Sequence, residues 1–245
     1  MLQPVELYSA LGLADRNNLF NQLQSIYNNL PETTCEGCAT CCKWGSPPAF
    51  FIEYLNMYKY LRDNMKDKYK EILEKSTEYF YLELVDASQA CPFLNEENKC
   101  SVYSVRPFTC RSFGLLSQQD FEIGDRSLRS LAEKYWEEYN IKISDELVNS
   151  ELAWCGKVAS SQGAHIEKSI LAGLAAQIST IDYKFFPQDL VDQEGTLLPY
   201  PTHMMNTVLG AGARARKIKV MKEFSDQGTK ELLNTFIEKA RSYQF

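Results

Sequence analysis

Apolar residues recur at helical spacing along much of the chain, and this pattern predicts a mainly helical protein. Between Asp15 and Leu30, large apolar side chains return every three or four residues, as on one face of a helix that Pro31 ends. The same periodicity predicts helices over 49–65 and 66–84, the second as an amphipathic surface helix. Further helices are expected over 128–139, 145–153, 165–178 and 230–243.

The centre of the sequence interrupts the helical pattern. Residues 32–48 are rich in glycine and proline and are predicted to form a loop. Cys91 and Cys100 stand at the start of the two arms of a short predicted hairpin, and a helical turn is expected from Arg106. The predicted fold class is therefore mainly α, a helical domain around an irregular cysteine-rich centre with one small β-hairpin. We divide the chain into an N-terminal helical segment (1–33), a cysteine-cluster domain (34–158) and a helical C-terminal extension (159–245), packed as one compact unit.

Charge and hydropathy narrow the classes of partner. Lys and Arg number 26 against 32 Asp and Glu, a net charge of -6, which argues against a general nucleic-acid-binding surface. No apolar stretch is long enough to cross a bilayer, and the first residues lack the features of a signal peptide. We therefore expect a cytoplasmic protein that binds neither nucleic acid nor membrane, and whose partner is a protein or a small molecule.

The eight cysteines carry the clearest chemical signal, and all of them lie between Cys35 and Cys155. In a reducing compartment, cysteine serves metal binding or catalysis more often than structural disulfides. The spacing Cys35-x-x-Cys38 lets a tight turn direct two thiolates to one ion, and Gly37 permits that turn. Cys41 extends the spacing to C-x2-C-x2-C, a run that bacterial ferredoxins use for iron–sulfur clusters. The sequence therefore predicts a metal centre.

Cys42 directly follows Cys41 and complicates the ligand set. Neighbouring side chains diverge by about 100° on a helix and about 180° on a strand, so both thiolates reach one ion only with distortion. The pair favours a polynuclear centre, two sites, or one ligand beside a packed or reactive thiol. The candidate metal ligands are Cys35, Cys38, Cys41, Cys42, Cys91, Cys100, Cys110 and Cys155.

Iron and zinc both suit a site rich in thiolates. The cysteine spacing and the Cys-Pro pair at 91–92 favour an iron–sulfur cluster of the [4Fe–4S] type, and zinc in a closed tetrahedral site is the alternative. Arg106 and Arg111 adjoin candidate ligands and are expected to bind the cofactor by offsetting thiolate charge. His165 and His203 are isolated in the sequence, so each is expected to be a surface or core residue and not a zinc ligand.

A glycine-rich segment near the C-terminus matches the residue pattern of a dinucleotide- or adenosine-binding fingerprint but not its structural context. Residues 210–215 follow the pattern G-x-G-x-x-A, but the preceding residues 204–209 make a poor strand. The fingerprint requires a strand before it and a helix after it, so we interpret the small residues as helix packing. The basic run that follows, from Arg214 to Lys222, is expected to be a solvated helix face.

Three motifs together resemble the YkgJ-type cysteine-cluster family, described as zinc- or iron-chelating domains. The chain carries C-x-x-C-x-x-C-C at 35–42, C-P-x-L at 91–94 and C-x-x-Y-x-x-R-P-x-x-C-R-x-F at 100–113, and the pair at 155–156 is also similar to the family. The resemblance implies a metal site built from these cysteines. The enzymatic relatives of the family resemble flagellin lysine N-methylases, which implies an S-adenosylmethionine-dependent methylase as an alternative function. A structural zinc interaction module is the third hypothesis, and no catalytic residue is identified.

Overall fold

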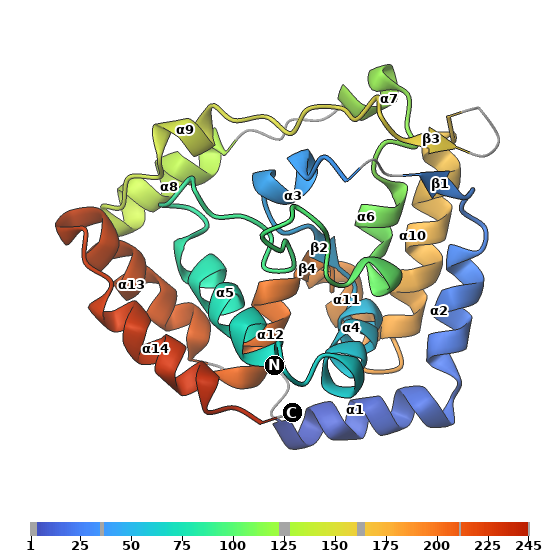
Figure 1. The fold of residues 1–245 in the computed structure, drawn as a ribbon, viewed down its shortest axis with the longest axis horizontal. Coiled ribbons are helices and arrows are strands. Elements are labelled where there is room, and N and C mark those ends of the chain that lie inside the picture. Colours follow the sequence, from blue (N-terminus) through green and yellow to red (C-terminus); the bar gives the residue numbers. More distant parts are fainter. Residues whose placement is uncertain (1–3, 35–36, 123–127, 161–164, 211, 245) are drawn as a thin grey trace.

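The computed structural model describes residues 4–34, 37–122, 128–160, 165–210 and 212–244, and these are mainly helical, as predicted (Figure 1). Two short antiparallel strand pairs join segments that are distant in sequence: β1 (Thr33–Thr34) with β3 (Ala159–Ser160), and β2 (Pro48–Ala49) with β4 (Leu198–Pro199). The helices are α1 (Pro4–Arg16), α2 (Leu19–Tyr27), α3 (Thr40–Trp44), α4 (Phe51–Asn64), α5 (Tyr69–Leu82), the 3-10 turn η1 (Tyr103–Val105), α6 (Phe108–Ser112), α7 (Gln118–Glu122), α8 (Arg129–Tyr139), α9 (Asp145–Val148), α10 (Lys168–Asp182), α11 (Gln188–Glu194), α12 (Tyr200–Val208), α13 (Ala213–Gln227) and α14 (Glu231–Arg241).

The helices surround the cysteine-rich segment. Figure 1 shows α2 and α10 along one side of the molecule and α13 and α14 along the other, with α4, α5 and α12 between them. Helix α5 packs against α12, α13 and α14, while α2 packs against α1, α4 and α10. One hydrophobic core draws buried side chains from the N-terminal, central and C-terminal parts of the chain, including Leu7, Tyr58 and Met204.

Several predicted elements differ from the structure. The hairpin expected near Cys91 is reduced to a single antiparallel bridge between Leu94 and Cys100, because Pro92 has no amide N–H to extend the pairing and the other arm enters the 3-10 turn at Tyr103–Val105. The loop expected over 32–48 contains the short helix α3, and α9 ends earlier than the predicted range 145–153. Helices α1, α7, α11 and α12 were not expected from the sequence pattern, whereas α13 includes the helix face expected from Arg214 to Lys222.

Helix α5 is not the amphipathic surface helix that its sequence suggested. Ile72, Leu73, Thr77 and Phe80 are buried, and so are the adjoining Tyr79, Tyr81 and Leu82, because α12, α13 and α14 cover several of its faces. Buried apolar area of this kind is the largest stabilising contribution available to a helix. The lysines and glutamates of its first half remain toward solvent.

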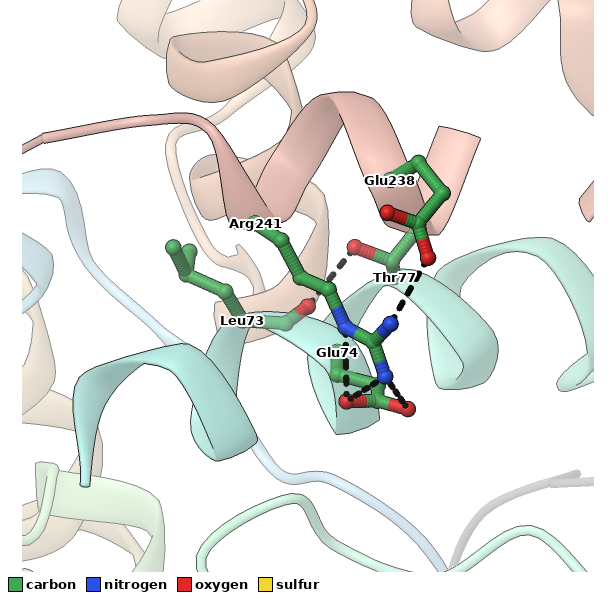
Figure 2. A network of polar contacts seen from close by, with 5 residues as sticks. All are labelled: Leu73, Glu74, Thr77, Glu238 and Arg241. Carbon is green, nitrogen blue, oxygen red and sulfur yellow. Dashed lines mark hydrogen bonds and ion pairs between the residues drawn. The ribbon is translucent and has the colours of Figure 1, made fainter. Parts of the chain in front are cut away.

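The edge of the contact between α5 and α14 carries a polar network, shown in Figure 2. Arg241 binds both carboxylate oxygens of Glu74 through Nη2, at 2.8 Å each, and Glu238 through Nη1 at 2.7 Å. Thr77 Oγ1 donates to the carbonyl of Leu73 at 2.7 Å, within α5. Partly exposed ion pairs contribute about 0–1 kcal/mol each, so apolar packing remains the main force between these helices.

A buried carboxylate from α10 caps the start of α4. The first amides of a helix have no partner within it, and a negative charge placed there also interacts favourably with the helix dipole. Asp182 accepts hydrogen bonds from the amides of Phe51 and Ile52, both at 2.9 Å, and is fully buried. Thr196 Oγ1 donates a further hydrogen bond to the same carboxylate. Asp182 therefore ties α10 and the 195–199 segment to the N-terminus of α4.

A second buried carboxylate, Glu53, joins α4 to the elements that carry the cysteines. Its Oε2 accepts from the amide of Phe50 at 2.9 Å, and its Oε1 accepts from the hydroxyl of Tyr27 at 2.6 Å. The same oxygen accepts from the amide of Phe108, the first residue of α6, at 2.6 Å. Glu53 is 1% exposed, so α2, α4 and α6 share one carboxylate inside the core.

These buried carboxylates predict a pH dependence of stability. Burial raises the pKa of Glu53 to about 7, from a usual value of 4.5, and that of Asp182 to about 6. A carboxyl with a higher pKa in the folded chain than in the unfolded chain stabilises the fold at low pH and loses that contribution as the pH rises through 7. Between about pH 4 and pH 8, the free energy of unfolding should therefore fall by about 3 kcal/mol because of Glu53.

Chemical denaturation of the protein and of Glu53→Gln across this range measures the effect, because glutamine does not titrate. The stability of the natural chain relative to the variant should decrease with rising pH. Parallel pH profiles for the two proteins would contradict the assignment.

Candidate metal centre

The first cysteine motif turns sharply before it enters a short helix. Gly37 has φ +68° and Ala39 has φ 59°, and these left-handed conformations bend the chain on either side of Cys38. Helix α3 then carries Cys41 and Cys42, whose sulfur atoms are 4.0 Å apart. The side chains of this adjacent pair thus diverge on the helix while their sulfurs remain neighbours.

Backbone contacts bring the second and third motifs to the first. The amide of Cys91 donates to the carbonyl of Cys42 at 2.7 Å, across nearly fifty residues of sequence. The bridge between Leu94 and Cys100 closes the turn that places Cys100 beside Cys91. Cys110 lies on α6, whose first amide Glu53 holds. The three motifs therefore converge because the chain connects them directly.

The cysteines of the three motifs line two adjoining cavities. We call the surface that these cysteines form between the cavities the thiol wall. The first cavity, of about 310 Å³, is lined by Cys38 and Cys155 together with the shared thiols. The second, of about 480 Å³, is lined by Cys91 together with the same shared thiols. All seven described cysteines line one or both cavities, and the remaining candidate, Cys35, lies outside the described residues. The shared residues are Cys41, Cys42, Cys100, Arg106, Cys110 and Phe113.

The described thiols are gathered but not arranged around one point. Within the described ranges, no group of three Cys, His, Asp or Glu side chains stands at metal-ligating geometry. The Cys41–Cys42 sulfur separation of 4.0 Å is nevertheless close to the roughly 3.8 Å that two sulfurs bonded at 2.3 Å to a tetrahedral ion would have. Side-chain rotation between staggered rotamers is the movement that ligation by three or more thiolates requires.

The electrostatics of the wall depend on the mutual proximity of the thiols. Burial, together with the neighbouring Cys100 and Cys41, raises the pKa of Cys91 to about 12. Burial also raises the pKa of Cys110 well above the usual value. The hydrogen bond from the Cys42 thiol lowers the pKa of Cys41 to about 6 and raises that of Cys42. The raised pKa values mean that deprotonating these thiols costs free energy. A bound metal cation would offset that cost, because it binds thiolates and displaces their protons.

The two arginines named from the sequence have different positions. Arg106 lines both cavities, lies over the ring of Tyr103 at 3.8 Å, and has a buried Nε without a hydrogen-bond partner. Its charge lowers the pKa of Cys41. Arg111 lines neither cavity: its Nε donates to the carbonyl of Arg106 at 2.8 Å, and its guanidinium lies over Tyr27. Arg106 therefore faces the thiols, and Arg111 holds the backbone that carries Arg106.

The β1–β3 pair accounts for the position of the last cysteine. β1 ends at Thr34, immediately before the first motif, and β3 begins at Ala159, shortly after Cys155. Gly114 packs against this returning segment, where an added Cβ would lie 2.8 Å from the side chain of Val158 and 3.1 Å from the carbonyl of Cys155. Pairing of segments about 125 residues apart thus brings Cys155 to the first cavity.

Neither histidine lines either cavity. His203 is 7% exposed, donates from Nε2 to the carbonyl of Ala49 at 3.0 Å, and stacks on Tyr54. Burial lowers the pKa of His203 to about 4, so the ring is neutral at physiological pH. His165 is exposed and its ring contacts that of Trp154.

The glycine-rich segment joins two helices. Helix α12 ends at Val208 and α13 begins at Ala213, so no strand precedes the glycines, and Ala213 is fully buried against the core. The packing interpretation of this segment agrees with that arrangement. The basic run is not entirely a solvated face, however, because Lys217 is paired with Glu83 and has only 12% of its side chain exposed. Its aliphatic stem and the pairing partner keep it inside the α5–α13 contact.

Several residues of the site have no signal in the sequence. Glu53 occupies an ordinary acidic position in the first turn of a helix, and only the structure brings the Phe108 amide to it. Ser46 and Tyr200 line the second cavity, and their distance in sequence hides their proximity. Long-range pairing through β2 and β4 is what brings these segments together.

The fold and the thiol wall define a helical protein built around a cysteine cluster. Residues 34–127 match the CxxCxxCC family model, described as "Putative zinc- or iron-chelating domain". This match confirms the resemblance inferred from the motifs, so the chain contains a CxxCxxCC domain of the zinc- or iron-chelating class over that segment. No solved structure matches the chain. Among the described residues, none of the helices has the length and apolar character needed to span a membrane.

The geometry predicts an order of thiol reactivity in the metal-free protein. Thiolates are the reactive form, so a lowered pKa and exposure favour alkylation, while burial opposes it. Cys38 accepts a hydrogen bond from Thr40 Oγ1 at 3.4 Å, which lowers its pKa, and it is only partly buried. At neutral pH, iodoacetamide should modify Cys38 and Cys41 first, and Cys91, which is buried, and Cys110, whose pKa is raised, last, as mass spectrometry of timed samples would measure.

The same reaction in denaturant supplies the control, because unfolding removes the differences between sites. Modification of Cys91 as early as Cys38 in the folded protein would contradict the buried position of the second motif.

Proposed function

We propose that the chain holds a thiolate-bound metal centre at the wall shared by the two cavities, and that iron in an iron–sulfur cluster is the group it binds. The observation that carries this proposal is the convergence of all seven described cysteines on two adjoining cavities. Soft thiolate ligands select iron–sulfur clusters and zinc among the metals common in proteins. The family match to a zinc- or iron-chelating domain supports the same class.

The motif pattern favours a cluster over a single zinc ion. A tetrahedral zinc ion and a [4Fe–4S] cluster each take four thiolates, so the number of thiols does not separate them. The C-x2-C-x2-C spacing at 35–41 and the Cys91-Pro92 pair resemble the iron–sulfur pattern of bacterial ferredoxins. We therefore assign the [4Fe–4S] type, with structural zinc as the alternative.

A positive charge in the wall of both cavities supports an anionic cluster at this place. Several thiolates around one centre leave a net negative charge, which is costly in a low-dielectric site without a counter-charge. Arg106 supplies that counter-charge from the wall of both cavities, and its buried Nε is a donor without a partner. Hydrogen bonds to cluster sulfurs are one of the means by which a protein sets the reduction potential. Arg106 is therefore the residue that stabilises the cofactor by charge and hydrogen bonding without being one of its metal ligands.

The methylase hypothesis receives less support than a metal-binding or redox module. The glycine-rich segment connects α12 and α13, which is not the strand–turn–helix context of an adenosine-cofactor site. We therefore favour a module whose cluster is its functional group. Isothermal calorimetry with S-adenosylmethionine separates the two hypotheses, since the methylase alone requires binding.

The metal assignment predicts the composition of the purified protein. Anaerobically purified chain should be brown, because thiolate-to-iron charge transfer absorbs visible light, and should contain both iron and acid-labile sulfide. Elemental analysis and a visible spectrum measure these properties. Colourless protein with stoichiometric zinc would favour the structural zinc hypothesis over the cluster. Protein that is purified without metal and binds neither iron nor zinc on reconstitution would refute the metal centre.

Serine substitutions are predicted to separate inner ligands from outer ones. Cys91→Ser and Cys110→Ser replace soft thiolates in the most buried part of the wall, so metal affinity should fall by about tenfold or more, and the free energy of unfolding should fall with it. Cys155→Ser is the matched control, because Cys155 lines the first cavity alone. It should retain the metal or lose only part of it.

Metal content per chain and thermal denaturation of the three variants measure this difference. Full metal retention in the double variant Cys91→Ser/Cys110→Ser would contradict the assignment of the wall as the metal centre.

A further inference from the structure

A third cavity lies apart from the thiol wall. It is lined by residues of α4, α11, α12 and α13 and of the adjoining loops, and it shares no lining residue with the first two cavities. Its volume of about 430 Å³ falls within the range of small-molecule sites, about 300–1,000 Å³. Its apolar wall is formed by Phe51, Phe186, Leu190 and Leu198. The metal centre therefore does not account for this cavity.

Three of the five polar side chains among the described residues that line the cavity already have hydrogen-bond partners. Thr196 Oγ1 donates to the carboxylate of Asp182. Thr207 Oγ1 donates to the carbonyl of His203, whose own Nε2 donates to the carbonyl of Ala49. These three side chains thus serve the fold, and two polar side chains of the lining are left for a ligand.

The remaining two are Arg214 and Asn206. Neither has a hydrogen-bond or ion-pair partner within the described part of the chain. Arg214 is exposed, so a ligand that enters from solvent reaches its guanidinium group. Asn206 is partly exposed, and because its Oδ1 is enclosed, Nδ2 is the end of the amide that stays accessible. The side-chain groups that are free to bind a ligand are therefore N–H donors.

The charge around the cavity favours an anion. Arg214 is the one charged side chain among the described lining residues, and it lies in the first turn of α13, where the helix dipole adds positive potential and no acidic residue opposes it. Burial first, and the Arg214 charge in addition, lower the pKa of His203 to about 4, so the positive potential reaches the cavity wall. Asp182 does not line the cavity, and its carboxylate accepts from the amides of Phe51 and Ile52.

The two free donors match a carboxylate better than a larger anion. A planar carboxylate offers two oxygens, which a guanidinium group and a neighbouring amide N–H satisfy with short, charge-assisted hydrogen bonds. A phosphate group carries more oxygens and more charge than these two side chains can pair. Behind the donors, the rings of Phe51 and Phe186 meet edge-on at 4.9 Å and present an apolar surface. An apolar ligand body in contact with this surface is removed from water.

We propose that the third cavity binds a small monocarboxylate with an apolar body, whose carboxylate pairs with Arg214 and Asn206 and whose body packs against Phe51 and Phe186. The inference goes beyond the metal centre and does not rest on it, because no cysteine lines this cavity.

Four probes test the ligand class on the full-length protein as purified, with its metal. 3-Phenylpropanoate has the proposed chemistry, 3-phenylpropanamide keeps its shape without the charge, 2-phenylethylphosphonate replaces the carboxylate, and acetate lacks the apolar body. Isothermal calorimetry measures the dissociation constants. 3-Phenylpropanoate should bind about tenfold more tightly than the amide, as hydrogen bonds to a charged acceptor support, and more tightly than the phosphonate and acetate.

Three variants locate the carboxylate and the cavity. Arg214→Gln should remove the preference for 3-phenylpropanoate over the amide. Lys219→Gln is the matched control, because it removes the same charge from the same helix at an exposed residue that does not line the cavity, and it should leave the preference unchanged. Leu190→Trp fills the mouth of the cavity from a partly exposed position without changing charge, so binding of 3-phenylpropanoate should fall about tenfold or more. Thermal denaturation verifies that each variant is folded.

The outcomes bear on this inference alone. Equal binding of 3-phenylpropanoate and its amide, or an unchanged preference in Arg214→Gln, would overturn the pairing with arginine. Tightest binding of the phosphonate would overturn the carboxylate class, and acetate binding as tightly as 3-phenylpropanoate would overturn the apolar body. Unchanged binding in Leu190→Trp would show that the carboxylate meets Arg214 outside the cavity. Protein that holds its metal and binds none of the probes rejects the site and retains the metal centre.

Discussion

The N-terminus of α4 is the constraint on which the other elements depend. Asp182 and Glu53 satisfy its unpaired amides from inside the core, and each carboxylate also binds a second element. Through Asp182, α10 is fixed to α4, and through Glu53, α6 and α2 are fixed to the same point. Because α6 carries Cys110, the position of one thiol follows from the hydrogen bonds of a helix start. A charged group in the core is costly, and these shared bonds offset that cost.

The thiol wall then combines two kinds of anchoring. Short-range contacts, such as the Cys91 amide to the Cys42 carbonyl, set the distance between motifs. Long-range strand pairs close the cavities on either side of the wall. The thiols are consequently crowded, and for Cys42, Cys91 and Cys110 the protonated form is favoured until a cation replaces the proton. This arrangement couples metal affinity to pH and to the stability of the surrounding fold.

Sequence reasoning succeeded where the information is local. The periodicity of α4 and α5 and the spacing of the cysteine motifs are properties of adjacent residues, and both led to the correct elements or family. The burial of α5 was missed because three helices from the C-terminal part cover it. Glu53 and Tyr200 were missed for a similar reason: their partners lie 26 to 55 residues away for Glu53, and the cavity that Tyr200 lines is built from the other motifs.

The pairing of β1 with β3 has a consequence for the order of events during synthesis. The register joins Thr34 to Ala159, so the segment that follows the last cysteine is translated about 125 residues after the segment that precedes the first motif. At 5–20 residues per second, this interval lasts roughly 6–25 s. The first motif is translated that long before the closing strand, and the third motif, which ends at residue 113, roughly 2–9 s before it. Metal delivery and protection from oxidation therefore concern the nascent chain before they concern the finished protein.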